Sequence, residues 1–269
     1  MRGFVLPVLR KAQLLMTKLT LTALPEFPLV EPGDDLGLLI LSSLETAGLV
    51  LADGDVLVLA QKIVSKSENR YGYLNQVEPS AQALTLAEQV DKDPRLVQLI
   101  LSESTEVVRQ RPGVIVVEHR LGYVHANAGI DKSNIQSDES NPRVLLLPLD
   151  PDASAAILRR QLQQKTGAVV SIIINDSAGR AWRNGTVGMA IGSAGFEPLE
   201  NLVGARDLFD RPLEITEVAV ADELAAAASF VMGQAAEAAP AVLIRGAQLR
   251  LAEVGSQTLI RDKAKDLFR

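Results

Sequence analysis

The first side chains suited to binding an anion lie in residues 61–70, QKIVSKSENR. Gln61, Lys62, Ser65, Lys66 and Arg70 follow an apolar run, at the point where a strand would end and polar side chains can converge. Lysines act as point charges for phosphate, so one interpretation is a phosphate site. A solvated basic loop is an equally good interpretation of these residues alone.

A second polar group lies in residues 127–134, NAGIDKSN. Taken alone, this composition favours an Asx-type turn, in which short polar side chains bond to nearby backbone. The alternative is a ligand site, with Asp131 as a hard-metal ligand and Asn134 beside a nucleotide. Gly129 would supply the bend that aims both side chains.

A third group lies in residues 174–195, INDSAGRAWRNGTVGMAIGSAG. Asp176, Ser177, Arg180 and Arg183 bring a carboxylate, a hydroxyl and two guanidinium groups within eight residues. Glycine then recurs at positions 185, 188, 192 and 195. Glycine at this density lets the backbone approach a ligand or a second backbone closely. We favour a ligand site over a simple glycine-rich turn with close strand packing.

A fourth segment, residues 231–240, reads VMGQAAEAAP. On its own it favours a helix that ends at Gly233 and continues as a loop. The only histidines, His119 and His125, have no third metal ligand near them in the sequence. We interpret both as structural or surface residues rather than as a metal pair.

The polar groups share one chemical property, because they offer carboxylates, hydroxyls, amides and lysines without soft ligands. Mg²⁺ or Mn²⁺ together with phosphate is the matching set of partners. The chain has no cysteine, which excludes disulfides, zinc–thiolate sites and cysteine nucleophiles. Neither the P-loop motif nor a glycine-rich dinucleotide motif between a strand and a helix occurs, so a P-loop NTPase and a Rossmann dehydrogenase are disfavoured.

Charge and composition narrow the class further. The formal net charge of −6 argues against nucleic-acid binding, which needs a cationic surface. Hydrophobic residues make up 47% of the chain, so we expect a folded protein. The absence of cysteine fits a cytoplasmic location.

The first residues, MRGFVLPVLRKAQLLM, resemble the start of a signal peptide, but charges break the apolar run. We interpret them as an extension or a misassigned start, with Met16 as the start; a membrane-surface helix is the weaker alternative. No run reaches the roughly 18 apolar residues that cross a bilayer, so we expect no membrane association. The expected organisation is an extension over 1–16, one domain over 17–246, and a helical tail over 247–269.

Apolar patterning predicts the elements that position these groups. Strands are expected at residues 18–23, 55–61, 113–120, 122–127, 143–148, 168–176, 213–220 and 241–246. Helices are expected at residues 36–48, 150–164 and 221–233, in two segments of 80–110 that meet near residues 93–94, and after residue 257. Because strands and helices are mixed without steady alternation, the pattern favours an irregular α+β (mixed α/β) fold.

Five segments together resemble one family, the coenzyme F420-0:L-glutamate ligases. They are residues 53–70, 127–134, 175–195, 220–233 and 242–246, in the order and spacing of that family. The resemblance covers nearly the whole chain, from Leu24 to Gly246. It implies a GTP-dependent ligase that adds L-glutamate to the deazaflavin precursor F420-0, and an intertwined homodimer with an unusual mixed-sheet fold.

The resemblance also implies roles for single residues and for cofactors. Divalent metal, Mg²⁺ or Mn²⁺, would be held by Asp131 and Asp176, with a second ion at Ser177 and Gln234; K⁺ is a further candidate. The GTP site would be lined by Leu24, Pro25, Glu26, Phe27, Gln61, Lys62, Lys66, Asn134, Met232, Gly233, Gln234 and Ala235. Family members can have an acidic residue where this chain has Gln234, and a neutral amide weakens the second metal site.

The chemistry of amide formation suggests an acyl-phosphate route, in which GTP activates the carboxylate of F420-0 before glutamate attacks it. Two alternatives remain open from the residues. One is a paralogue that joins another amino acid to another phosphorylated acid. The other is a non-catalytic GTP-binding protein, which the neutral Gln234 would suit.

Overall fold

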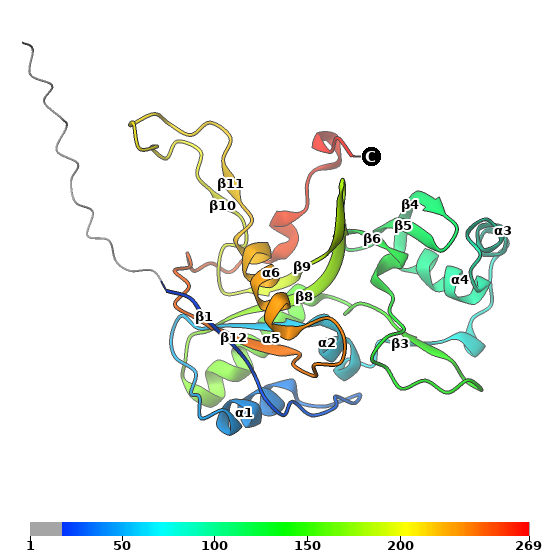
Figure 1. Ribbon diagram of the computed structural model, residues 1–269, viewed down its shortest axis with the longest axis horizontal. Helices are drawn as coiled ribbons and strands as arrows, with labels where there is room; N and C mark the ends of the chain where they lie inside the picture. The colour runs from blue at the N-terminus through cyan, green and yellow to red at the C-terminus, as the bar shows by residue number, and fades with distance from the viewer. Residues whose placement is uncertain (1–17, 269) are drawn as a thin grey trace, which may run out of the picture.

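A central five-stranded sheet organises the protein, and the computed structural model describes residues 18–268 (Figure 1). The extension predicted over residues 1–16 lies outside the described residues. The strand order is β1 (Thr20–Ala23), β12 (Ala241–Arg245), β2 (Val56–Ala60), β8 (Ser171–Arg180), β9 (Arg183–Ala194). Only β2 and β8 run parallel. The strand at the start of the described chain therefore pairs with one near its end.

Helices cover both faces of this sheet, because its middle strands are apolar on both sides. Leu57 and Leu59 of β2 pack in the same core cluster as α1 (Leu36–Thr46) and α5 (Pro151–Thr166). Val56 and Val58 pack with α6 (Val220–Met232) on the opposite face. The strand expected at residues 55–61 is therefore present and buried on both faces, and the predicted α+β class is confirmed.

A second group of elements, which we call the small lobe (residues 71–145), has a hydrophobic core of its own. It contains β3 (Tyr71–Tyr73), η1 (Leu74–Gln76), α3 (Ala81–Val90), α4 (Pro94–Ser102), β4 (Ser104–Arg111), β5 (Val114–His119), β6 (Val124–Ala126), η2 (Asn127–Gly129) and β7 (Arg143–Leu145). Strands β4, β5 and β6 form one sheet, while β3 pairs with β7. Figure 1 shows this lobe to the right of the central sheet.

Helix starts follow the capping residues in the sequence. Asp150 accepts a hydrogen bond from Ala153 N at the start of α5, and Asp93 caps α4 with Pro94 at the first helical position. Asp152, in the first turn of α5, accepts from the backbone N–H of Ser193 and Ser256. It therefore ties the helix to β9 and to the C-terminal segment.

Three expectations from the sequence were wrong in detail. The second helix expected within residues 80–110 ends at Ser102, because β-branched residues after it pair with β5 as β4. The alternating run at 213–220 contributes only the short strand β11 (Glu217–Val218), which pairs with β10 (Glu200–Asn201). The tail has two 3₁₀ turns, η3 (Ser256–Leu259) and η4 (Lys263–Lys265), in place of a surface helix.

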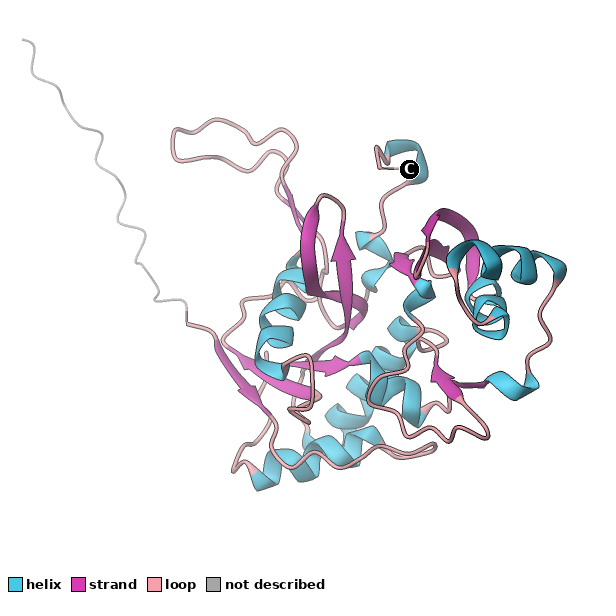
Figure 2. Ribbon diagram, turned by 45° about the vertical axis from the view of Figure 1, so that its right-hand side comes forward, coloured by secondary structure: helices cyan, strands magenta, loops and turns pink. Residues whose placement is uncertain are grey.

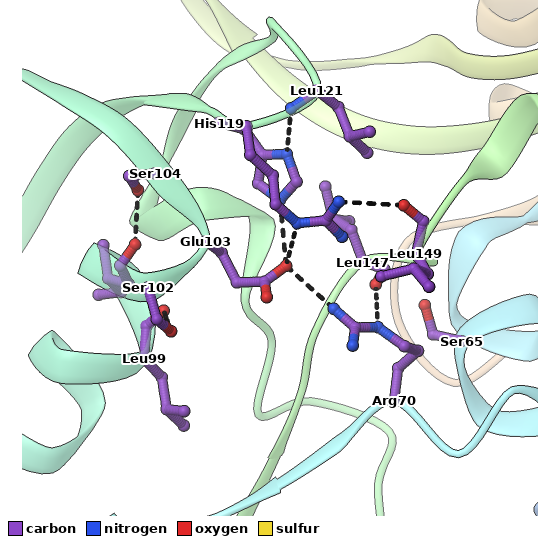
Figure 3. Close-up of polar contacts among 12 residues, drawn as sticks. Ser65, Arg70, Leu99, Ser102, Glu103, Ser104, His119, Leu121, Leu147 and Leu149 are labelled. Carbon is purple, nitrogen blue, oxygen red and sulfur yellow. Dashed lines mark hydrogen bonds and ion pairs between the residues drawn. The ribbon is translucent and has the colours of Figure 1, made fainter. Parts of the chain in front are cut away.

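A buried ionic cluster joins the small lobe to the chain that leaves α2 (Gln61–Ser67). Glu103, the residue after α4, accepts a hydrogen bond from Arg70 at 3.0 Å and lies 3.5 Å from the His119 ring (Figure 3). Arg120 donates to the same carboxylate oxygen at 3.2 Å. Burial disfavours the ionised Glu103, but His119 and the two arginines outweigh it and lower the pKa to about 2.

Candidate nucleotide and metal site

The candidate site lies at the carboxyl ends of β2 and β8. These strands are parallel neighbours, and Ala60 pairs with Asn175, so the residues that follow each of them emerge side by side. Helix α2 starts directly after β2 and carries Lys62 and Lys66 one turn apart. Strand β8 continues through Asp176, next to Asn175, into an edge that pairs with β9.

The segment after η2 forms one wall of the site. The backbone of Asp131 pairs with Leu145 of β7 through two hydrogen bonds of 2.9 Å. The Lys62 ammonium lies 2.7 Å from Asp131 Oδ2 and donates to Ser133 Oγ at 2.7 Å. Lys66 donates to the Asn134 carbonyl at 2.8 Å. The two lysines of α2 therefore contact residues that lie far from them in the sequence.

The turn that precedes this wall has a backbone conformation that is unusual for L-residues. Asn127, Ala128 and Gly129 all have positive φ, and a Cβ on Gly129 would lie 2.9 Å from side-chain atoms of Leu147. Glycine is therefore required here both for its conformation and for space. The bend predicted at Gly129 is confirmed, and it sends the chain toward Asp131.

The loop after α6 forms the opposite wall. The helix ends at Met232, Gly233 has a positive φ of 75°, and Gln234 follows, as the sequence predicted for the helix end. Ser177 Oγ donates to Gln234 Oε1 at 2.6 Å, while Gln234 Nε2 donates to Ser229 Oγ at 2.8 Å. Asn134 Nδ2 donates to the Ala235 carbonyl at 3.0 Å and so links this wall to the first one.

These walls enclose a cavity of about 480 Å³. Eleven of the residues singled out by the sequence line it: Phe27, Gln61, Lys62, Lys66, Asn134, Asp176, Ser177, Met232, Gly233, Gln234 and Ala235. Asp131 is outside the lining but is held beside it by Lys62. Leu24, Pro25 and Glu26 do not line the cavity. Leu24 is fully buried in the core, and its N–H donates to the Ala241 carbonyl.

Sequence reasoning missed several residues of the lining. Asn175 is buried beside Asp176, and its Oδ1 has no hydrogen-bond partner among the described residues. The missed lining residues are Pro28, Leu29, Val30, Ala60, Ile63, Ile135, Asn175, Ala236, Glu237, Ala238, Ala239 and Pro240. Most are apolar or small and give no chemical signal. Asn175 had one, since a polar residue directly precedes the carboxylate at the end of an apolar strand.

The two carboxylates of the site have different electrostatic surroundings. Burial raises the pKa of Asp176 to about 7, and the nearby carboxylate of Asp131 adds to the rise. Burial also opposes ionisation of Asp131, but hydrogen bonds from Lys62 and Ser133 outweigh it and lower the pKa. Burial lowers the pKa of the Lys66 ammonium. The site therefore holds partly desolvated charges of both signs.

Histidine lies closer to this site than the sequence suggested. His125 is buried, with Nδ1 3.6 Å from Asp176 Oδ2, and burial lowers its pKa to about 4. His119 is fully buried beside Glu103. Both are therefore interior residues, and His125 packs behind the site carboxylate as a neutral ring.

The donor atoms of the site are oxygens, the type that a hard divalent cation prefers. Asp131 and Asp176 supply carboxylate oxygens, while Ser177 and Gln234 supply neutral ones. The Lys62 ammonium lies 2.7 Å from Asp131 and favours the ionised form of Asp176. The position between these two carboxylates therefore accommodates a positive charge. Over residues 18–268, no three His, Cys, Asp or Glu side chains lie together as a metal cluster. A metal held here would need the neutral oxygens or a bound phosphate.

The third polar group of the sequence is divided by the fold. Asp176 and Ser177 line the cavity, whereas Arg180 and Arg183 lie farther along, at the turn between β8 and β9. Gly188 and Gly192 lie within β9, where an added Cβ would come within 2.6 Å of the α6 and α5 backbone respectively. These two glycines therefore serve close helix packing, while the arginines are separate from the cavity.

A family model described as F420-0:Gamma-glutamyl ligase matches residues 25–246 of this chain. The chain therefore belongs to the F420-0:gamma-glutamyl ligase family, as its motifs predicted. The match covers the central sheet from β2 to β12, the small lobe and every wall of the cavity described above.

Relatives with the name coenzyme F420:L-glutamate ligase match almost end to end. The protein of Methanothermobacter thermautotrophicus is 48% identical over 93% of this chain and 99% of its own length. The protein of Methanopyrus kandleri is 46% identical over 89% and 93% respectively. That of Archaeoglobus fulgidus is 41% identical over 90% and 93%.

Membrane association was not expected from the sequence. None of the described helices combines the length and the apolar character that a membrane crossing requires.

Proposed function

We propose that this protein adds L-glutamate to F420-0 in a GTP-dependent reaction that passes through an acyl phosphate. The family match and the names of the relatives support the ligase activity and its two substrates. The observation that carries the finer proposal is the cavity itself, which Lys62, Lys66 and Asp176 line, with Asp131 held beside it by Lys62.

The cavity suits a nucleotide in size and in lining. Its volume of about 480 Å³ lies within the roughly 300–1,000 Å³ common for small-molecule sites. Apolar residues such as Phe27 and Met232 offer surface for a base, whereas Lys62 and Lys66 lie at one side as charges for phosphates. We place the triphosphate along α2, with Asn134 and Ala235 beside it.

The proposed chemistry takes two displacements. A carboxylate oxygen of F420-0 attacks the γ-phosphorus of GTP, the bond to the β-phosphate oxygen breaks, and GDP leaves. The amine nitrogen of glutamate then attacks the acyl carbon, phosphate leaves, and the nitrogen loses a proton. Lys62 and Lys66 stabilise the charge that spreads over the phosphoryl oxygens, and the cavity walls hold the reactants in line.

Divalent metal is part of the proposal. Asp131 and Asp176 would hold one Mg²⁺ or Mn²⁺, and Ser177 with Gln234 would contribute to a second. When bound, such an ion offsets charge on the transferring phosphoryl group. The buried Asp176 supports this assignment, because a carboxylate with few partners in a partly desolvated site is stabilised by a cation.

The test is product mass. The purified protein is incubated with F420-0, L-glutamate and GTP, with Mg²⁺ or Mn²⁺ and with or without K⁺. We expect F420-0 to gain the mass of one or more glutamyl units while GDP and phosphate appear in equal amounts. No mass gain with any of these metals would refute the ligase proposal. Replacing glutamate by other amino acids separates this activity from that of a paralogous ligase.

We also propose that the protein acts as a homodimer. The segment between β10 and β11 extends away from the central sheet as a long arm (Figures 1 and 2). Its Leu208 is 93% exposed, and Phe209 and Ile215 are also largely exposed. An extended arm with apolar side chains supports an interface with a second copy. Light scattering after size exclusion should give twice the chain mass, and a monomer would refute this assignment.

A further inference from the structure

The hairpin of β8 and β9 extends beyond the cavity and ends in an exposed turn (Figure 1). At that turn Arg180 pairs with Arg183, and Ala181 and Trp182 lie between them. Trp182 is the only tryptophan of the chain, and it is 86% exposed. Its φ of 64° is unusual for a bulky residue. The turn therefore presents a large aromatic ring to solvent, where folding alone gives it little to pack against.

Among residues 18–268, no carboxylate forms an ion pair with the arginines of this turn. Arg180 donates to the Asn184 carbonyl, and Arg183 has no hydrogen bond or ion pair among the described residues. The nearest aromatic neighbour is Phe268, whose ring centre lies 6.2 Å from that of Trp182. Arg261 lies over Phe268, with Cζ 5.7 Å from the ring centre. Rings and guanidinium groups thus form one patch, in a chain whose net charge is −6.

One strand connects this patch to the cavity. Ser177 lines the cavity, and Arg180 is three residues farther along β8, a distance of about 10 Å in extended chain. Gly179 lies on the same face of the strand as Ser177 because side chains alternate. A Cβ added at Gly179 would meet no atom within 4 Å, and the same holds at Gly185 across the turn. The face of the strand that carries Ser177 and Gly179 is therefore open up to the register shift at Arg180, where the turn begins.

We propose that the turn around Trp182, Arg180 and Arg183 is the subsite for the planar ring and the anionic side arm of the acceptor. This inference rests on the proposed function, which puts the reacting carboxylate of a deazaflavin acceptor in the cavity. Trp182 stacks on the ring, and the arginines pair with anionic groups of the side arm. Charge complementarity supports this occupant, since two arginines flank the ring and no carboxylate of the described part of the chain pairs with them.

The single tryptophan makes a direct binding test possible. F420-0 is titrated into the intact protein while tryptophan emission is followed. We expect saturable quenching, because the stacked heterocycle lies against the only emitting residue. GTP alone and glutamate alone should leave the emission unchanged. Arg183→Ala should raise the F420-0 concentration at half-quenching about tenfold, whereas Arg109→Ala, an exposed arginine on β4, should not.

Steady-state kinetics give the second readout. Trp182→Ala should raise KM for F420-0 about tenfold or more and leave KM for GTP and for glutamate unchanged. Trp182→Phe keeps a ring and should retain most of the affinity. Quenching by F420-0 without any glutamyl product would refute the ligase proposal and support the subsite. Product formed with a normal KM for F420-0 in Trp182→Ala would refute the subsite alone.

The same surface could instead contact a second copy of the chain. In that case Trp182→Ala would change the mass measured by light scattering and would leave the KM for F420-0 unchanged. This outcome would overturn the subsite. An unchanged mass together with the raised KM supports it.

Discussion

Glu103 and Asp176 are carboxylates of similar burial with opposite electrostatics. Their side chains are 12% and 14% exposed, respectively. Burial raises the pKa of both, yet the pKa of Glu103 falls to about 2 while that of Asp176 rises to about 7. At Glu103 the partners outweigh burial, whereas at Asp176 burial and the Asp131 carboxylate outweigh the hydrogen bond from Ser177 N.

Glu103 has two positively charged partners, Arg70 and Arg120, and the His119 ring lies 3.5 Å from its carboxylate. Asp176 accepts one backbone hydrogen bond, from Ser177 N, and faces the carboxylate of Asp131. A buried carboxylate with cationic partners can hold two parts of a fold together. A buried carboxylate without such partners is stabilised when a cation binds to it, which is typical of a functional site. We infer a structural role for Glu103 and a ligand-binding role for Asp176.

The largest effect is expected from Asp176→Asn. The variant keeps the shape of the side chain but removes the charge proposed to hold metal, so ligation should fall roughly 100-fold or more. The fold should remain intact, because the ionised aspartate is disfavoured by its surroundings. Product mass and circular dichroism check the two expectations. Wild-type rates in this variant would refute the metal role of Asp176.

Glu103→Gln should have the opposite pattern. Removing this charge leaves Arg70 and Arg120 without their carboxylate, at a cost of about 3 kcal/mol in the free energy of unfolding. Urea denaturation measures the loss. Glu106→Gln is the matched control, because its ion pair with Lys263 is exposed and should contribute at most about 1 kcal/mol. Equal losses in both variants would contradict the role given to Glu103.

The two carboxylates should also respond to pH with opposite sign. The pKa of Glu103 is depressed, so its contribution to stability is lost as pH falls from about 4.5 towards 2. The pKa of Asp176 is raised, so the folded state holds an extra proton between about pH 4 and 7, and stability falls as pH rises through that window.

Urea denaturation of metal-free protein at several pH values measures this second dependence. The decline between about pH 4 and 7 should be smaller in Asp176→Asn, and Mn²⁺ should offset it in the wild type. A slope that is the same in the variant would assign the decline to other groups.

The smallest effect is expected from Gln234→Glu. The amide accepts from Ser177 and donates to Ser229, and a carboxylate keeps only the first of these bonds. It adds negative charge beside Ser177 and should therefore tighten Mn²⁺ binding by up to about tenfold, with little change in stability. Calorimetric titration with Mn²⁺ gives the affinity. Unchanged or weaker binding would argue against a second metal near Gln234.

Sequence periodicity predicted most of the elements, because their burial follows from local pattern. Strands β2 and β8 and helix α5 were found from apolar patterning. Strand β4 was assigned to a helix because its polar sequence lacks the apolar pattern of a strand, although it pairs as a hairpin with β5 across Pro112 and Gly113. Strand β9 was interpreted as a glycine-rich segment, although its Gly188 and Gly192 serve close packing against helices.

The candidate site was predictable only in part, and for a similar reason. The lysines and aspartates could be singled out in the sequence because their charged side chains suit phosphate and metal. Eleven of the proposed residues line one cavity. Leu24 was carried over from the family motif and lies in the core instead of the lining. The apolar lining of residues 236–240 gave no chemical signal, and Asn175 was overlooked beside Asp176.

The sequence by itself determined the family, the hard character of the donors and the α+β class, because residue type and spacing along the chain contain that information. Tertiary structure alone decided which carboxylate is paired and which is not. Glu103 and Asp176 both follow apolar runs. Only the fold brings Arg70 and Arg120 to the first and Asp131 to the second. Charge partners act through space, and their distance in space cannot be deduced from their spacing in the chain.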